Sequence, residues 1–194
     1  MPSLTNLLIP TYKQNLTSLS KWLDKKGVQD LLDRRLAPDM FPLSTQVRFI
    51  CLQAHEGVCR LQPMVELPSI LKELDEEGRA FKDGTVTDTV EKCKARIQQT
   101  LDFLEALDES TLDKDGAAER SITLQLGELT FVMTGEQYAR DWALPQFYFH
   151  VVAAYSILRN AGVDMGKADY VPHMFAYLQP ASDKAAEDAP PSSK

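Results

Sequence analysis

WALPQFYFHVVAAYSILRNAG, residues 142–162, gathers aromatic side chains, a histidine and an arginine into one apolar run. The run is long enough for several helical turns, and Pro145 either begins this helix or kinks one that continues from upstream. We therefore expect a long central helix, against which the rest of the chain packs.

Three further segments carry apolar residues every three or four positions, which is the spacing of one buried helix face. They lie at about 4–22, 45–61 and 87–107, and Ser44 is the expected N-cap of the second. Apolar residues near 70–74 indicate a further short helical piece.

The apolar spacing changes to simple alternation between 120 and 133, which predicts a β-hairpin that turns at about Gly127 and Glu128. Thr134 is expected to cap the helical segment that follows. The sequence thus predicts a mainly all-α protein, an antiparallel four-helix bundle with a small β-hairpin before the last long helix.

Length and composition indicate one domain over residues 1–178, followed by a tail at 179–194 that is rich in Pro, Ala, Ser and charge. Such a tail has little to bury, and we expect it to be disordered. The net charge is −7 without a basic run, which argues against nucleic-acid binding. No apolar run reaches the roughly 18 residues of a membrane span, and no signal peptide is evident, so the expected location is cytoplasmic.

His150 and Gln146 lie four residues apart in the central helix and therefore share a face. Directed into a bundle core, they could bind a metal or orient a small substrate. The alternative is a buried histidine that is merely satisfied by a hydrogen-bond partner. Cys51, His55 and Cys59 also follow one another at four-residue steps, but steps of about 6 Å along one helix cannot converge on a single ion, so core packing is the expected role.

Arg35 and Asp39 lie in an apolar, proline-containing loop. They either form ordinary surface ion pairs or anchor a ligand carboxylate as a pair. The chain has no Gly-rich phosphate loop, no G-x-S-x-G and no H-E-x-x-H, so a covalent hydrolase triad has no support from motifs.

Three motifs carry a resemblance to a known family: RLAPDMFPLSTQV at 35–47, LPQFYFHVVAAYSILRNAGV at 144–163 and GKADY at 166–170. Together they resemble an uncharacterised bacterial and fungal domain family of the DinB/YfiT-like helix-bundle superfamily. The resemblance covers residues 3 to about 172 and implies the bundle fold. It also implies a divalent-metal site, which superfamily members typically build from one histidine on the second helix and an H-x-x-x-H pair on the last.

Alignment on Leu158, Arg159 and Gly162 places His150 on the second histidine of that pair and Gln146 on the first. Gln46 is the best polar candidate on the second helix. One imidazole with two amides is a poor metal set, so we expect no cofactor, although a divalent metal held by other ligands stays open.

The expected site is therefore a small-molecule pocket between the second and last helices, lined by Phe41, Gln46, Gln146, Phe149 and His150. In an enzyme, His150 would be the general acid or base, and the amides would orient the substrate. The resemblance implies thiol-dependent transfer or isomerisation, or metal-assisted hydrolysis. The alternative is a non-catalytic ligand-binding or dimerisation module, and a homodimer is possible in either case.

Overall fold

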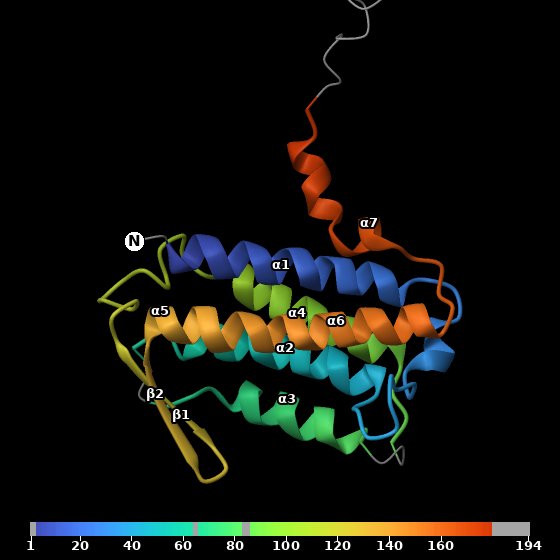
Figure 1. Ribbon diagram of the computed structural model, residues 1–194, viewed down its shortest axis with the longest axis horizontal. Coiled ribbons are helices and arrows are strands. Elements are labelled where there is room, and N and C mark those ends of the chain that lie inside the picture. The colour runs from blue at the N-terminus through green and yellow to red at the C-terminus, as the bar shows by residue number, and fades with distance from the viewer. Residues whose placement is uncertain (1–2, 64–65, 83–85, 180–194) are drawn as a thin grey trace, which may run out of the picture.

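The computed structural model describes residues 3–63, 66–82 and 86–179, and the predicted tail at 179–194 lies outside them except for its first residue. Within these residues, four long helices form the expected antiparallel bundle: α1 (Leu4–Leu23), α2 (Leu43–Cys59), α4 (Val90–Glu105) and α6 (Leu144–Asn160) (Figure 1). The shorter helical segments are η1 (Val28–Leu31), α3 (Ser69–Ala80), α5 (Gly135–Tyr138), η2 (Ala139–Ala143), α7 (Lys167–Tyr170) and η3 (Pro172–Tyr177). The predicted fold class is confirmed.

Helix α2 is the centre of the packing, because it contacts α1, α3, α4 and α6. Helix α3 lies outside the four-helix bundle, against α2, and is longer than the short piece predicted near 70–74 (Figure 1). The two helices approach closely at Gly78, where an added Cβ would meet the ring of Phe49. The Thr45 hydroxyl donates a hydrogen bond to the Gly78 carbonyl at 2.7 Å, which fixes this crossing.

The beginning of α2 differs from the prediction, because Ser44 lies inside the helix and does not cap it. The backbone N–H groups of Leu43 and Ser44 donate instead to the carbonyls of Arg34 and Leu32, at 3.0 and 2.9 Å. The loop that folds back before Pro42 thus satisfies the N–H groups that a capping side chain would otherwise serve.

The predicted hairpin is present as β1 (Ser121–Leu126) paired with β2 (Leu129–Thr134), and its turn lies at the predicted place. Strand β1 buries Ile122 and Leu124, whereas most of β2 is exposed. An isolated hairpin is only marginally stable. The buried side chains of Ile122 and Leu124, which share one face of β1, therefore hold the hairpin on the bundle.

Thr134 caps α5 as predicted, accepting a hydrogen bond from the N–H of Gln137. The helical path then continues through the π-helical turn η2 into α6 without a break (Figure 1). In this turn the N–H of Leu144 donates to the carbonyl of Ala139. Pro145 has no N–H to donate, so one backbone hydrogen bond of a regular helix is missing at this position. The wider π-helical turn lies directly before Pro145 and lets the helix continue into α6.

None of the helices in the described ranges is long and apolar enough to cross a membrane.

Gly57 should resist substitution, although it lies in the interior of α2. An added Cβ would overlap the hydroxyl of Tyr12, which is fully buried on α1. Gly57→Ala should therefore destabilise the protein by about 1–3 kcal/mol, even though alanine favours a helix by about 1 kcal/mol over glycine. Urea unfolding measures the change.

The control removes the obstructing atom. In a Tyr12→Phe background, the nearest contact of the new Cβ is the ring carbon Cζ at 3.1 Å, so the cost of Gly57→Ala should fall by more than half. An equal cost in both backgrounds would show that the close contact of α1 and α2 at this point is not as described.

Candidate functional site

The pair of Gln46 and His150 joins α2 to α6. The Nδ1 of His150 lies 2.8 Å from the Oε1 of Gln46, and the Nε2 of Gln46 donates to the Phe41 carbonyl at 3.2 Å. Because a carbonyl only accepts, the Gln46 nitrogen faces Phe41 and its oxygen faces the ring. The imidazole must therefore carry its proton on Nδ1, which leaves Nε2 with a free lone pair in the neutral ring.

The surroundings of His150 keep this ring neutral. The side chain is only 8% exposed, and the rings of Phe49 and Phe149 each pack edge-on to it at 5.2 Å. Burial lowers the pKa of His150 to about 4, because the charged imidazolium would lose its hydration. Among the described residues the Nε2 atom has no hydrogen-bond partner, so it is available to a ligand that reaches this edge.

Three other predicted residues lie around this pair. Phe41 is half-buried and packs edge-on against Phe49 at 5.2 Å, which links it to His150. Phe149 is 58% exposed and flanks the ring on the solvent side. Gln146 is half-buried one turn earlier on α6. The structure thus gathers Phe41, Gln46 and His150 with Phe149 beside them, and their binding of a ligand stays a prediction.

Arg35 and Asp39 form no ion pair with each other within the described ranges. One guanidinium nitrogen of Arg35 donates to the Met40 carbonyl at 2.6 Å, and another donates to the carbonyl of Lys82 beyond the end of α3. Asp39 is exposed. Arg35 therefore ties its own loop to the segment after α3, and the joint binding of a ligand carboxylate stays a prediction.

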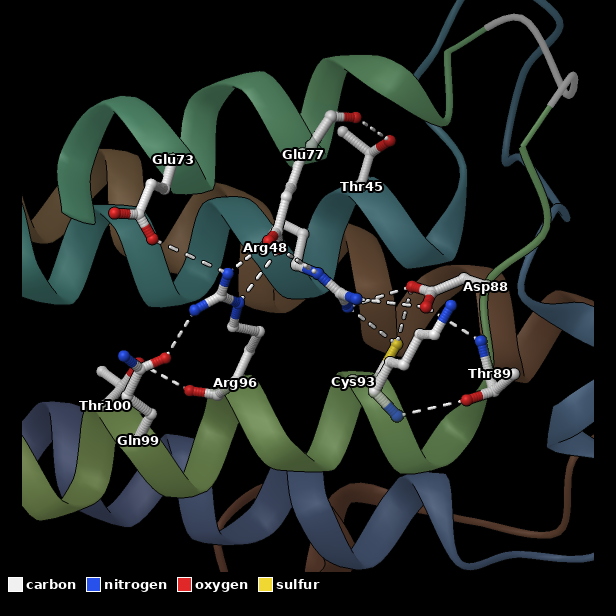
Figure 2. Close-up of polar contacts among 12 residues, drawn as sticks. Thr45, Arg48, Glu73, Glu77, Asp88, Thr89, Cys93, Arg96, Gln99 and Thr100 are labelled. Carbon is white, nitrogen blue, oxygen red and sulfur yellow. Dashed lines mark hydrogen bonds and ion pairs between the residues drawn. The ribbon is translucent and has the colours of Figure 1, made fainter. Parts of the chain in front are cut away.

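A second polar cluster, which the sequence did not predict, lies between α2 and α4 (Figure 2). Arg48 is 2% exposed and contacts both carboxylate oxygens of Asp88, at 3.1 and 3.0 Å. The Cys93 thiol donates to the same carboxylate at 3.2 Å and lies 3.0 Å from Arg48 Nη1. The signal in the sequence was one arginine within the apolar 43–51 segment, but the sequence does not say which carboxylate faces it.

This cluster is built for stability rather than for reaction. Glu77 joins it by accepting from Arg48 Nε at 3.3 Å and from Arg96, and the ring of Phe81 lies 5.3 Å from the Arg48 guanidinium. Burial raises the pKa of Cys93 to about 12, so the thiol stays protonated and is not a nucleophile. Every charge deep in the cluster is thus paired, as buried charges must be.

The line of Cys51, His55 and Cys59 is buried on α2. His55 stacks on the ring of Phe103 at 4.2 Å between centroids, and burial lowers its pKa to about 4. In the ranges that the structure describes, no group of three or more His, Cys, Asp or Glu side chains is arranged to hold a metal ion.

Residues 4–171 match the family described as "Domain of unknown function (DUF1993)". The chain belongs to this DUF1993 family. A crystal structure of a DinB family member protein from Shewanella denitrificans shares 30% identity with it, over 87% of this chain and 91% of that chain, with a TM-score of 0.66. No curated protein matches the chain. The resemblance to an uncharacterised DinB-like domain family is confirmed.

The DUF1993 chain does not offer the three imidazoles that the wider superfamily resemblance implies for a divalent metal. His150 is the one imidazole at this place, and its partners at the implied positions are the amides Gln46 and Gln146. The Gln46 oxygen already accepts the Nδ1 proton of His150, so it lies beside Nδ1 and not beside the free Nε2. This donor set does not fit a metal site built from three histidines.

Proposed function

We propose that this DinB-like protein binds a small molecule at the Nε2 edge of His150, where Nε2 accepts a hydrogen bond from the ligand. The observation that supports the proposal is the 2.8 Å contact between His150 Nδ1 and Gln46 Oε1. A histidine held by a carbonyl-type oxygen on one nitrogen presents the other in a fixed direction, as oriented histidines do in functional sites.

The acidity of His150 decides which role it can take. With its pKa lowered to about 4, the ring is neutral at pH 7, so Nε2 accepts a proton or hydrogen bond and has none to give. In this resting state the ring can act as a hydrogen-bond acceptor or as a general base. Because general bases work best with a pKa near the working pH, ligand binding is better supported than proton transfer.

The side chains next to the His150 ring indicate what kind of ligand would bind at this site. Phe149 offers an apolar surface next to the ring, and Gln146 offers an amide one helical turn away. A ligand with an O–H, N–H or S–H group and a small apolar part matches both. A low-molecular-weight thiol is such a ligand, in line with the thiol-dependent transfer or isomerisation that the resemblance implies.

The second candidate function is a dimerisation module, and it rests on the outer face of α6. Tyr148, Phe149 and Val152 are all exposed there and form a short apolar stripe. A second copy of the chain would cover such a stripe. In that case Phe149 belongs to an interface, and the His150 ring is a satisfied buried side chain.

Native mass spectrometry of the protein as purified, together with metal analysis, shows whether the protein is a dimer and whether it carries a bound molecule or metal. These results are the first distinction between the two functions. Reduced glutathione, N-acetylcysteine, Zn²⁺, Ni²⁺ and Mn²⁺ are then titrated by calorimetry. At least one thiol should bind, and His150→Leu should weaken it by about tenfold or more, the loss of roughly 1.4 kcal/mol. The control His173→Ala changes a histidine in η3 and should bind as the parent does.

Thiol binding that is unchanged in His150→Leu would contradict the proposed role of His150. A dimer mass without a bound molecule, together with no binding of any probe, would favour the dimerisation module.

A further inference from the structure

The loop before α2 carries the first of the three motifs on which the family resemblance rests, and its contacts lead to His150. The motif at 35–47 begins with Arg35 and also contains Phe41 and Gln46. We propose that Arg35 is a positioning residue, which fixes the proton of His150 on Nδ1 through this loop and Gln46. This role rests on the proposed function, because it keeps Nε2 free to accept from a ligand.

The middle of this loop needs an attachment to the bundle. Backbone hydrogen bonds from the N–H groups of Leu43 and Ser44 close the loop at its base. Residues 37–40 form a turn, in which the N–H of Met40 donates to the carbonyl of Ala37 at 3.0 Å. That bond lies within the turn, so it does not fix the position of the turn relative to the helices.

Arg35 supplies the attachment. One guanidinium nitrogen donates to the Met40 carbonyl at 2.6 Å, and another donates to the carbonyl of Lys82. Lys82 follows α3, which packs against α2, so this second carbonyl belongs to the frame of the bundle. In the ranges that the structure describes, no other side chain donates to the backbone of residues 37–40. A guanidinium suits this task, because its donors form a rigid fork that can hold two acceptors at once.

Two covalent restrictions carry the constraint from Met40 to the next carbonyl. Met40 and Phe41 are joined by a planar peptide unit, which leaves only the two backbone dihedrals of Phe41 between the two carbonyls. Pro42 restricts Phe41 to an extended conformation, because its ring excludes the helical region for the residue before it. Holding the Met40 carbonyl therefore also restricts the direction of the Phe41 carbonyl.

The Phe41 carbonyl decides which way the Gln46 amide faces. It accepts from Gln46 Nε2 at 3.2 Å, so the amide oxygen lies on the other side, 2.8 Å from His150 Nδ1. Without this carbonyl the amide could turn over and donate its N–H to Nδ1, since a carboxamide has both an acceptor and a donor. The proton of the ring would then lie on Nε2, and the acceptor at this edge would be lost.

Nitrogen NMR on ¹⁵N-labelled protein tests this role without a ligand, because the shifts of Nδ1 and Nε2 report where the proton lies. At neutral pH nearly all of the parent should carry it on Nδ1. In Arg35→Met, which keeps a long unbranched side chain, the Nδ1–H share should fall to about half, since both orientations of the Gln46 amide then make one hydrogen bond to the ring. The matched control Arg34→Met changes an exposed arginine and should give the parent's share.

Two further variants show that the effect passes through the loop and Gln46. Arg35→Lys keeps the charge, but one ammonium cannot hold two carbonyls in fixed directions, so the Nδ1–H share should also fall. It replaces Arg35→Met if that chain does not fold. Gln46→Leu removes the amide, and adding Arg35→Met to it should not change the share further.

An Nδ1–H share equal to the parent's in folded Arg35→Met or Arg35→Lys would overturn the proposal, and so would a further change on top of Gln46→Leu. The thiol titrations judge the proposed function separately. If no thiol binds, that function fails while the effect of Arg35 on the ring can still be read. If a thiol binds, Arg35→Met should weaken it about twofold, because only half of the chains then present an acceptor at Nε2.

Discussion

Arg48→Met should destabilise the protein by about 3–5 kcal/mol, because it leaves the Asp88 carboxylate buried without its cation. The side chain of Asp88 is fully buried, and Arg48 contacts both of its oxygens. Methionine fills much of the same volume, so the loss reports the unpaired charge more than a cavity. Urea unfolding at neutral pH measures the change in the free energy of unfolding.

The control is the double variant Arg48→Met with Asp88→Asn, in which no charge is left unpaired. It should recover much of the lost stability, since replacing both partners costs far less than removing one. Lys114→Met breaks an exposed pair with Asp108 and should cost less than about 1 kcal/mol. If Arg48→Met cost no more than Lys114→Met, the cluster in Figure 2 would not be the buried support described above.

Acid should destabilise the protein between about pH 6.5 and pH 4, through His150 and His55. Both histidines have a pKa lowered to about 4 by burial, whereas an unfolded histidine titrates near 6.5. Below about 6.5 the unfolded chain binds protons that the folded chain excludes, so stability falls as the pH falls. It levels off for these groups near pH 4, after a loss on the order of 3 kcal/mol per histidine.

The variant His55→Phe separates the two contributions. Phenylalanine keeps the stacking surface against Phe103 and removes one of the two titrating groups. Urea unfolding at several pH values between 7 and 4 should then give about half the slope of the parent in this window. A free energy of unfolding that is constant from pH 7 to pH 5 in the parent would show that neither ring is held neutral by the fold.

Much of the fold followed from the spacing of apolar residues, because each long helix buries one continuous face. The predictions were less accurate for α3, whose buried face is narrow, and for the beginning of α2, where no side chain caps the helix. Helix α3 was underestimated because its buried side consists of Leu71, Leu74 and Gly78 among charged residues. Ser44 was taken for a cap because a sequence does not show that the preceding loop folds back and that its carbonyls accept from the N–H groups of Leu43 and Ser44.

The candidate site was predictable only in part. Gln46 and His150 are 104 residues apart, and the family resemblance, not the spacing, placed them together. The contacts of Arg48 with Asp88 and Cys93 could not be predicted, because they depend on where the segment before α4 crosses α2.

A titration of the His150 ring by nitrogen NMR on ¹⁵N-labelled protein tests the proposed site most directly, with His150→Leu used to assign its signals. The Gln46 contact predicts a proton on Nδ1 and an unprotonated Nε2 from neutral pH down to a pKa of about 4. A ring that carries its proton on Nε2, or that becomes charged near pH 6.5, would contradict an acceptor at this edge.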